Sequence, residues 1–399
     1  MKFKAFVQDL VVDRQIVDTF LDVHQPNWAV FDQTLGYRLR SARVRDGVDG
    51  CWTQSRYVPF GERRMVNHPE KHCRIATYGN SFTQCHQVSD GETWQEQLAA
   101  HFGEPVRNYG IGGYGAYQAL LRMRTHETCP ETSGDYVILN IFDDDHFRSI
   151  DRWRWIRIGE FRKEVRQRNP FYFHANPWSF LRLDTTGKGF VEHPSLCPTP
   201  ESLYNLCDED FVAEAFRDDF VLHCELAKAG GDYDANVLRH TADLLGMSAD
   251  LGDAGRAAER LHVAYALRSS EYVVEAAKAF CAEKGKKLMV MLSFGAGNIR
   301  CAVSGGERFD RGFKAWLDET GLPVFDLFDE HREDFGQFRL TVDAYLQRYF
   351  IGGYGHYNPT GNHFCAFSLK PDLLNWLDPK PPAYFDGGIA SAGMAGLLA

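Results

Sequence analysis

Short apolar runs alternate with amphipathic stretches along much of the chain, and this alternation predicts both strands and helices. Five apolar runs are expected to form strands, at 74–79, 106–110, 135–142, 287–292 and 323–327. Helical patterns lie between them, at 89–98, 116–124 and 256–284. Strands that alternate with helices favour an α/β fold with a three-layer, doubly wound parallel sheet, in which ligands bind at the carboxyl ends of the strands.

The stretch between the third and fourth predicted strands is too long for a simple connection. It holds a turn at 186–189 between strand-like runs and helical patterns around 210–228 and 236–246, and we expect it to cap the edge of the sheet that binds ligand. Before the first strand, one helical pattern at 12–21 stands among polar stretches that contain glycine. The predicted organisation is an N-terminal arm (1–70), a core domain (71–150 and 266–378), an insertion within that domain (151–265) and a flexible tail (379–399).

Acidic side chains outnumber basic ones, and the formal net charge is −10. Nucleic acids and anionic membranes bind clustered Lys and Arg, so neither is an expected partner. Charged residues interrupt the N-terminal stretch before it reaches the length of the apolar run of a signal peptide. No later apolar run is long enough to span a membrane. The 10 cysteines form no CxxC pair, as is typical of reduced thiols. We therefore expect a cytoplasmic protein without structural zinc, and the oligomeric state stays open.

The first segment with candidate chemistry is Gly-Asn-Ser-Phe-Thr at 79–83, directly after the first predicted strand. A sharp turn at this place can lift the Ser81 hydroxyl above the sheet and point backbone N–H groups toward it. A serine that only caps the turn is the structural alternative.

The second segment is rich in glycine and follows the next predicted strand. Residues 108–115 read Asn-Tyr-Gly-Ile-Gly-Gly-Tyr-Gly, and backbone without side chains can approach a ligand and offer N–H donors to an oxyanion. Two alternatives remain, a phosphate cradle and glycines that serve tight turns only. The segment lacks the Lys-Ser/Thr of a P-loop and the glycine spacing of a dinucleotide turn.

The third segment follows the strand at 135–142 and contains Asp143, Asp144, Asp145 and His146. Adjacent residues of an extended chain point to opposite sides, so at most two of these carboxylates would face one metal ion. A polar loop with one functional member is the preferred interpretation, and a divalent metal site is the alternative.

The fourth segment lies near the end of the core, at 355–363. Asn358 is placed as the N-cap and Pro359 as the first residue of the last helix. His356 would then lie in the loop before that helix, available for proton transfer, whereas His363 would lie within it.

In this order the four segments resemble the SGNH (GDSL-like) hydrolase superfamily, over about 75–150 and 285–375. The family's blocks are a GDS turn, a glycine after the second strand, an asparagine after the third and a late histidine. The resemblance implies a flavodoxin-like SGNH fold, no cofactor, Ser81 as nucleophile and His356 as its base. It also implies that the backbone N–H groups of Ser81 and Gly113 receive the oxyanion. Residues 35–38 look like the arm that precedes the nucleophile in longer members.

Three positions depart from the family pattern. Asn80 replaces the Asp before the nucleophile, and Asp144 aligns with the family's oxyanion Asn. Asp144 would have to be protonated to serve there, since an ionised carboxylate repels an oxyanion; Asn80 is an alternative donor. Gly353 stands where the family has the Asp that supports the histidine. His356 would then be hydrogen-bonded to a backbone carbonyl or to a distant acid such as Asp329 or Asp343. A Ser-His dyad without a third member is the other alternative.

The resulting hypothesis is a serine esterase or deacylase that acts on a small-molecule or carbohydrate ester. An O-acyltransferase with the same acyl-enzyme and a non-catalytic binding protein are the alternatives. Substrate contacts are expected from Asp143, Asp145, Tyr114 and Arg148. Arginines after the third strand are further candidates for an anionic substrate group, namely Arg152, Arg154 and Arg157. Aromatic residues could stack on a sugar, line an acyl pocket or belong to the core, namely Trp153, Trp155, Phe171, Tyr172, Phe173 and Trp178.

Overall fold

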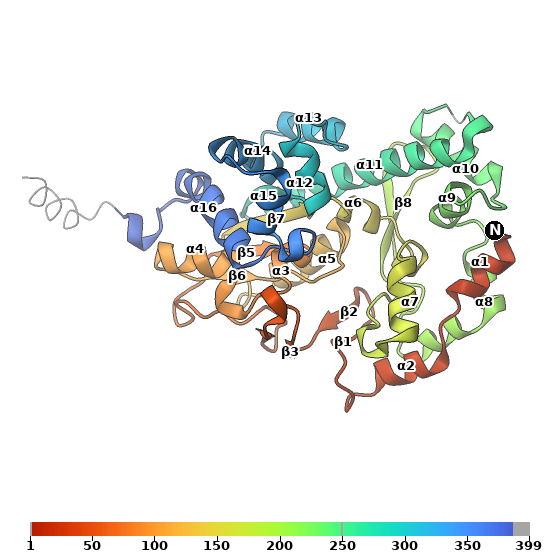
Figure 1. Ribbon diagram of the computed structural model, residues 1–399, viewed down its shortest axis with the longest axis horizontal. Helices are drawn as coiled ribbons and strands as arrows, with labels where there is room; N and C mark the ends of the chain where they lie inside the picture. The colour runs from red at the N-terminus through yellow and green to blue at the C-terminus, as the bar shows by residue number, and fades with distance from the viewer. Residues whose placement is uncertain (1, 249, 386–399) are drawn as a thin grey trace, which may run out of the picture.

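The computed structural model describes residues 2–248 and 250–385, and its centre is a five-stranded sheet (Figure 1). The strands run in the order β11-β10-β7-β5-β6, and every neighbouring pair is parallel. Their bounds are β5 Ile75–Tyr78, β6 Val106–Asn108, β7 Tyr136–Phe142, β10 Lys287–Ser293 and β11 Val324–Asp326. In chain order this is the 2-1-3-4-5 arrangement of a doubly wound sheet. The predicted parallel α/β sheet is therefore confirmed.

Helices flank the sheet and bury its apolar side chains. α4 packs against α16, whereas α5 packs against α11, and α11 against α13. The helices of the core are α4 Trp94–Phe102, α5 Ala116–His126, α11 Ala254–Glu283, α12 Ala296–Val303, α13 Arg311–Glu319, α14 Leu327–Gln337, α15 Val342–Tyr349 and α16 Pro359–Trp376. The predicted start of the last helix is confirmed, since Asn358 Oδ1 accepts a hydrogen bond from the N–H of Gly361 at 2.9 Å and Pro359 is the first helical residue.

The N-terminal segment is more regular than the arm expected from its polar stretches. It contains two helices and two small antiparallel hairpins, α1 Phe3–Leu10, α2 Arg14–Leu21, β1 Ala29–Asp32 with β2 Gly36–Leu39, and β3 Ala42–Val44 with β4 Thr53–Ser55. α1 lies beside α8 of the insertion (Figure 1). The Trp155 indole donates a hydrogen bond to Leu10 O at 3.1 Å, and Arg162 pairs with Asp9 at 2.7 Å. The segment therefore shares a core with the insertion.

The insertion between β7 and β10 forms helices and one hairpin. α6 Asp145–Arg148 follows β7 and precedes it, and its own elements are α7 Gly159–Gln167, β8 Phe180–Leu183, β9 Phe190–His193, α8 Glu209–Ala215, α9 Phe220–Lys228 and α10 Ala235–Leu245. The turn expected at 186–189 joins β8 to β9, which pair antiparallel. The long α11 then returns the chain to the sheet. No helix among the described residues is long and apolar enough to cross a membrane.

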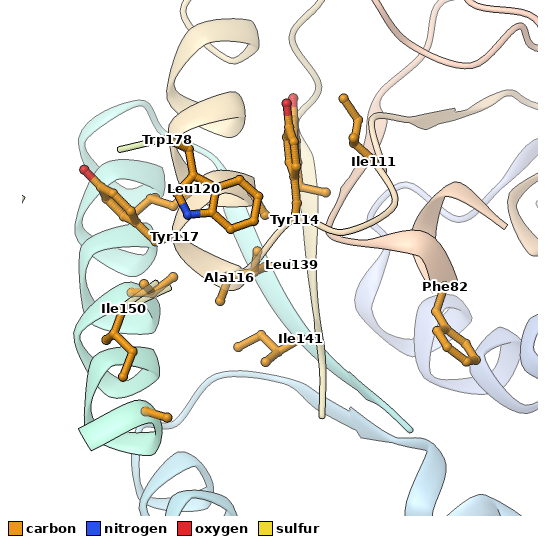
Figure 2. Packing of buried hydrophobic residues seen from close by; sticks show 14 of the residues in the cluster. Phe82, Ile111, Tyr114, Ala116, Tyr117, Leu120, Leu139, Ile141, Ile150 and Trp178 are labelled. Carbon is orange, nitrogen blue, oxygen red and sulfur yellow. The ribbon is translucent and has the colours of Figure 1, made fainter. Parts of the chain in front are cut away.

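Of the alternatives for the aromatic side chains after the third strand, the core is the correct one for most of them. Trp153, Trp155, Phe173 and Trp178 are fully buried. Tyr114 is also fully buried, and Figure 2 shows it with Trp178 among side chains from α5 and β7. The expectation that Tyr114 contacts substrate is therefore wrong, because its ring is enclosed by apolar neighbours.

The predicted flexible tail lies mostly outside the described residues. Within the described part, Pro382–Tyr384 form a short 3-10 turn, and the Tyr384 ring packs edge-on against Phe102 at 6.1 Å between centroids.

Gly110 fixes how closely the chain after β6 approaches the chain after β5. A Cβ at this position would collide with the backbone nitrogen of Gln84 and lie 2.5 Å from the carbonyl carbon of Thr83. We expect Gly110→Ala to lower the free energy of unfolding by about 2 to 3 kcal/mol, measured by urea denaturation. The control is Gly297→Ala in α12, where a Cβ meets nothing within 4 Å. An equal effect in both variants would contradict this interpretation.

Candidate active site

The turn after β5 presents Ser81 as the first residue of the short helix α3, Ser81–Gln84. Asn80 caps this helix, since its Oδ1 accepts a hydrogen bond from the N–H of Phe82 at 2.7 Å. Gly79 is required by close packing, because a Cβ there would lie 2.7 Å from Asn140 O on β7. The sequence at 79–81 therefore forms a tight strand-to-helix turn, as predicted.

The Asn80 side chain is anchored to the segment that follows β7. Its Nδ2 donates to Asp145 Oδ2 at 2.5 Å, and the same oxygen accepts the N–H of Phe142 at 2.9 Å. Arg148 Nη1 donates to Asp145 Oδ1 at 2.8 Å. Burial raises the pKa of Asp145 to about 7, against the opposing effect of the Arg148 charge. Both polar atoms of the Asn80 amide are thus engaged in holding the turn, and Asp145 and Arg148 are structural partners of it rather than open contacts for substrate.

Asp144 cannot take the place of the family's oxyanion asparagine. Its carboxylate pairs with Arg148 at 2.7 Å and with Arg157 at 2.9 Å. Burial alone would raise the pKa of Asp144, but Arg157 and Arg148 outweigh it and hold that pKa well below its usual value. The group is therefore ionised, and the hypothesis of a protonated Asp144 is wrong.

The three adjacent carboxylates face three different sets of partners. Asp143 accepts the N–H of Gly295 at 2.9 Å and the amide of Asn298 at 2.6 Å, so it ties the end of β7 to the end of β10. No group of three or more His, Cys, Asp or Glu side chains with metal-binding geometry occurs in the described part of the chain.

His356 is supported by a residue that the sequence did not point to, Gln87. Gln87 Oε1 accepts the backbone N–H of His356 at 3.1 Å and contacts His356 Nδ1 at 2.9 Å, while Gln87 Nε2 donates to Asp46 O at 2.9 Å. A backbone N–H can only donate and a carbonyl can only accept, so these two contacts fix which end of the amide is oxygen. Nδ1 must therefore carry the proton. In the neutral imidazole, Nε2 is then the free acceptor, as a general base requires.

The acids proposed to support His356 lie elsewhere. Asp343 pairs with Arg300 at 2.6 Å and Asp329 is 3.9 Å from Arg332. Both expectations are wrong, because an amide rather than a carboxylate faces Nδ1. Gln87 adopts a left-handed backbone conformation, with φ 71°, which a side chain other than glycine rarely adopts without a tertiary contact to hold it.

The ring of His356 lies against the segment that carries Ser81. Its centroid is 5.2 Å from that of Phe82 and 5.0 Å from that of His86. Burial lowers the pKa of His356 well below its usual value, and the charges of His86 and Arg148 act in the same direction. Among the hydrogen bonds of the described residues, none joins Ser81 Oγ to His356. Catalytic pairs often close this bond only when substrate is bound.

The glycines after β6 lie next to Ser81. A Cβ on Gly112 would be 3.5 Å from the Ser81 Cβ, and its N–H donates to Gln84 Oε1 at 2.7 Å. Gly113 has φ 89°, and a Cβ there would collide with Arg154 Nη1 and lie 2.5 Å from the Tyr37 hydroxyl. Glycine is therefore required at 113 both for its conformation and for the close approach of these two side chains.

Arg154, which the insertion supplies, carries a charge without a carboxylate partner. Its Nε and Nη1 are buried and have no hydrogen-bond partner, and no ion pair of Arg154 occurs among the described residues. Burial and the neighbouring Arg148 lower the pKa of Arg154 from its usual value. The sequence grouped it with Arg148 and Arg157, and only the structure separates the unpaired arginine from the two paired ones.

Aromatic and imidazole rings lie beside the glycines, since a Cβ on Gly112 would be 3.3 Å from the Trp28 ring. The Trp28 ring lies edge-on to His86, at 5.6 Å between centroids, and to His174 at 4.6 Å. Burial, with a contribution from Arg154, lowers the pKa of His174 to about 3, so the ring is neutral. Trp28 comes from the N-terminal segment and His174 from the insertion, so both of these segments shape the site.

Comparison with known proteins does not assign the chain to a family. No protein-family model matches the chain, and no curated protein matches its sequence.

Replacing Gln87 tests its role in positioning His356. Gln87→Glu puts a carboxylate beside Nδ1, which favours the imidazolium, so we expect the acidic limb of kcat/KM to move up by about one pH unit or more. In the wild type that limb should lie below pH 6.5, the usual pKa of histidine, because burial keeps His356 neutral to lower pH. The measurement is a pH profile of ester hydrolysis. The control is Gln337→Glu, at an exposed position; an unchanged profile in Gln87→Glu would refute the role.

Replacing Asp145 tests the anchor between the two strand ends. Asp145→Ala leaves the Asn80 amide, the Phe142 N–H and part of Arg148 without their buried acceptor, so we expect a loss of about 3 kcal/mol in unfolding free energy. Urea denaturation measures it. Asp318→Ala removes a half-exposed carboxylate that pairs only with Lys314, and it should cost at most about 0.5 kcal/mol. Equal stabilities of the two variants would show that the anchor is dispensable.

Proposed function

We propose that the protein is a serine esterase or deacylase that works through an acyl-enzyme on Ser81, with His356 as the base. The observation that carries the proposal is the contact between Gln87 and His356. It assigns the proton to Nδ1 and leaves Nε2 as an acceptor, at the edge of the sheet where Ser81 begins a helix after a tight turn.

The proposed reaction follows the two-step chemistry of serine nucleophiles. His356 Nε2 takes the proton of Ser81 Oγ while Oγ bonds to the ester carbonyl carbon, and the carbonyl oxygen becomes an oxyanion. The bond to the alkoxy oxygen then breaks, and the alcohol leaves with the proton from His356. Water, deprotonated by His356, attacks the acyl-enzyme, and the acid leaves as Ser81 regains its proton.

Oxyanion stabilisation is assigned to the backbone N–H groups of Ser81 and Gly113 and to the charge of Arg154. Arg154 Nη1 lies directly against Gly113, and a buried cation near a developing negative charge acts in a medium of low dielectric constant. Asn80 and Asp144 have no part in this assignment, since the first holds the turn and the second is an ionised partner of two arginines.

The test is hydrolysis of p-nitrophenyl acetate and longer p-nitrophenyl esters by the wild type and by Ser81→Ala. We expect the variant to lose at least about a thousandfold in kcat/KM, and a serine-directed fluorophosphonate to label the wild type but not the variant. Ser304→Ala, at an exposed position far from these residues in sequence, should match the wild type. Adding an alcohol acceptor and measuring the transferred acyl product tests transfer against hydrolysis.

Two results would overturn the proposal. One is equal inactivity of the wild type and Ser81→Ala across all acyl lengths with no labelling, as a binding protein would give. The other is equal activity of both, which would place the nucleophile elsewhere.

A further inference from the structure

A cavity of about 420 Å³ shares Trp28 with the candidate site and is lined by basic and aromatic side chains, among them Trp28, Arg40, Arg43, Arg45, Trp52 and Tyr172. It is formed by residues on either side of the β1–β2 hairpin (26–28 and 40–41), by β3 and the loop that leads to β4, and by residues 169–172 of the insertion. Its walls are therefore the segments that also supply Trp28 and His174 to the site.

Trp28 lines this cavity and also lies close to the turn that carries Ser81. Its ring lies 3.3 Å from the position of a Cβ on Gly112, next to Ser81, and it contacts His86. Two hydrogen bonds also join residues at or next to the cavity lining to residues of the candidate site. Asp46, which follows Arg45, accepts the amide of Gln87, and Tyr172 O contacts His174 Nδ1. The cavity is therefore connected to the surroundings of Ser81 and His356 through Trp28, Asp46 and Tyr172.

The charge of the cavity is opposite to that of the chain. The net charge is −10, yet none of the residues that line the cavity is acidic. Arg40 donates to Gln25 O at 2.9 Å and Arg45 to Gly50 O at 2.8 Å. Backbone carbonyls of this kind orient a guanidinium without neutralising it, and neither arginine forms an ion pair among the described residues.

The aromatic side chains are placed to bind a ring. Trp52 is 57% exposed, which is unusual for so large an apolar side chain. The Arg43 guanidinium lies over its ring, 5.0 Å from the centroid. A second cavity, of about 280 Å³, is lined by Asp143, Asp144 and Glu259 and by no basic side chain. Of these two cavities, the first is therefore the one suited to an anion.

We propose that this cavity binds the alcohol part of the ester, and that this part is a ring bearing a carboxylate or a similar anion, as in an aromatic acid or a uronic acid. Trp28 and Trp52 contact the ring, and Arg43 and Arg45 receive the anion. The proposal rests on the proposed function for the reaction itself, and the binding measurement below separates the two.

The experiment compares esters that differ only in charge. The first pair is 4-acetoxybenzoate and 4-acetoxybenzamide, and the second is the O-acetylated methyl glycosides of glucuronic acid and of glucose. After division by each ester's uncatalysed rate, we expect kcat/KM to favour the anion by about tenfold in at least one pair. The pair that shows the preference identifies an aromatic or a sugar ring. High salt should reduce the preference.

The variant Arg43→Gln/Arg45→Gln should bring the ratio of the two kcat/KM values close to 1, whereas Arg339→Gln, at an exposed position outside the cavity, should leave it unchanged. Calorimetric binding of the same pairs to Ser81→Ala gives a readout that needs no turnover. Tighter binding of the anion by Ser81→Ala, with no hydrolysis by the wild type, would support the cavity and refute the esterase. Equal binding and equal kcat/KM within each pair would overturn the cavity proposal and leave the esterase standing.

Discussion

The buried carboxylate of Asp145 joins the chain after β5 to the chain after β7, and the geometry of the site depends on this contact. One of its oxygens accepts the Asn80 amide and the Phe142 N–H, and the other accepts Arg148. Arg148 in turn holds Asp144, which pairs with Arg157 of the insertion. Since a buried carboxylate is stable only with such partners, Ser81 is positioned by an electrostatic network as well as by its own turn.

An amide beside His356 has a chemical consequence. Gln87 fixes the tautomer and orientation of the ring, as an acid would, but it adds no negative charge to stabilise the imidazolium that would form in the proposed reaction. Burial and the Arg148 charge oppose the imidazolium as well. In the proposed reaction, His356 would therefore be neutral over a wide pH range but a weak proton acceptor. Stabilisation of the oxyanion would then have to contribute more to lowering the barrier, and a buried cation such as Arg154 can supply it.

The sequence predicted the parts that local patterns determine. The five apolar runs became the strands of the sheet, and Asn358 and Pro359 begin the last helix, because these features need only a few neighbouring residues. Gln87 was missed because nothing local distinguishes it from a surface glutamine; its role arises from a contact across 269 positions. Tyr114 was misassigned for a related reason. Tyr114 is next to Gly113 in sequence, but this does not determine where its ring points. The ring is buried because it packs into the core.

The sheet and the two added segments make different contributions to the site. Ser81, Gly113, Gln87 and His356 belong to the core around the sheet, whereas Trp28 and Tyr37 come from the N-terminal segment and Arg154 and His174 from the insertion. The buried guanidinium nitrogens of Arg154 have no partners, which lowers the stability of the fold. A bound anion, or the negative charge that develops on a reacting substrate, would offset this loss. Both segments also support the residues of the core, since Asp46 of the N-terminal segment accepts the Gln87 amide and Arg157 of the insertion pairs with Asp144. A change in either segment would therefore affect the position of His356 or of the Ser81 turn as well as the side chains around them.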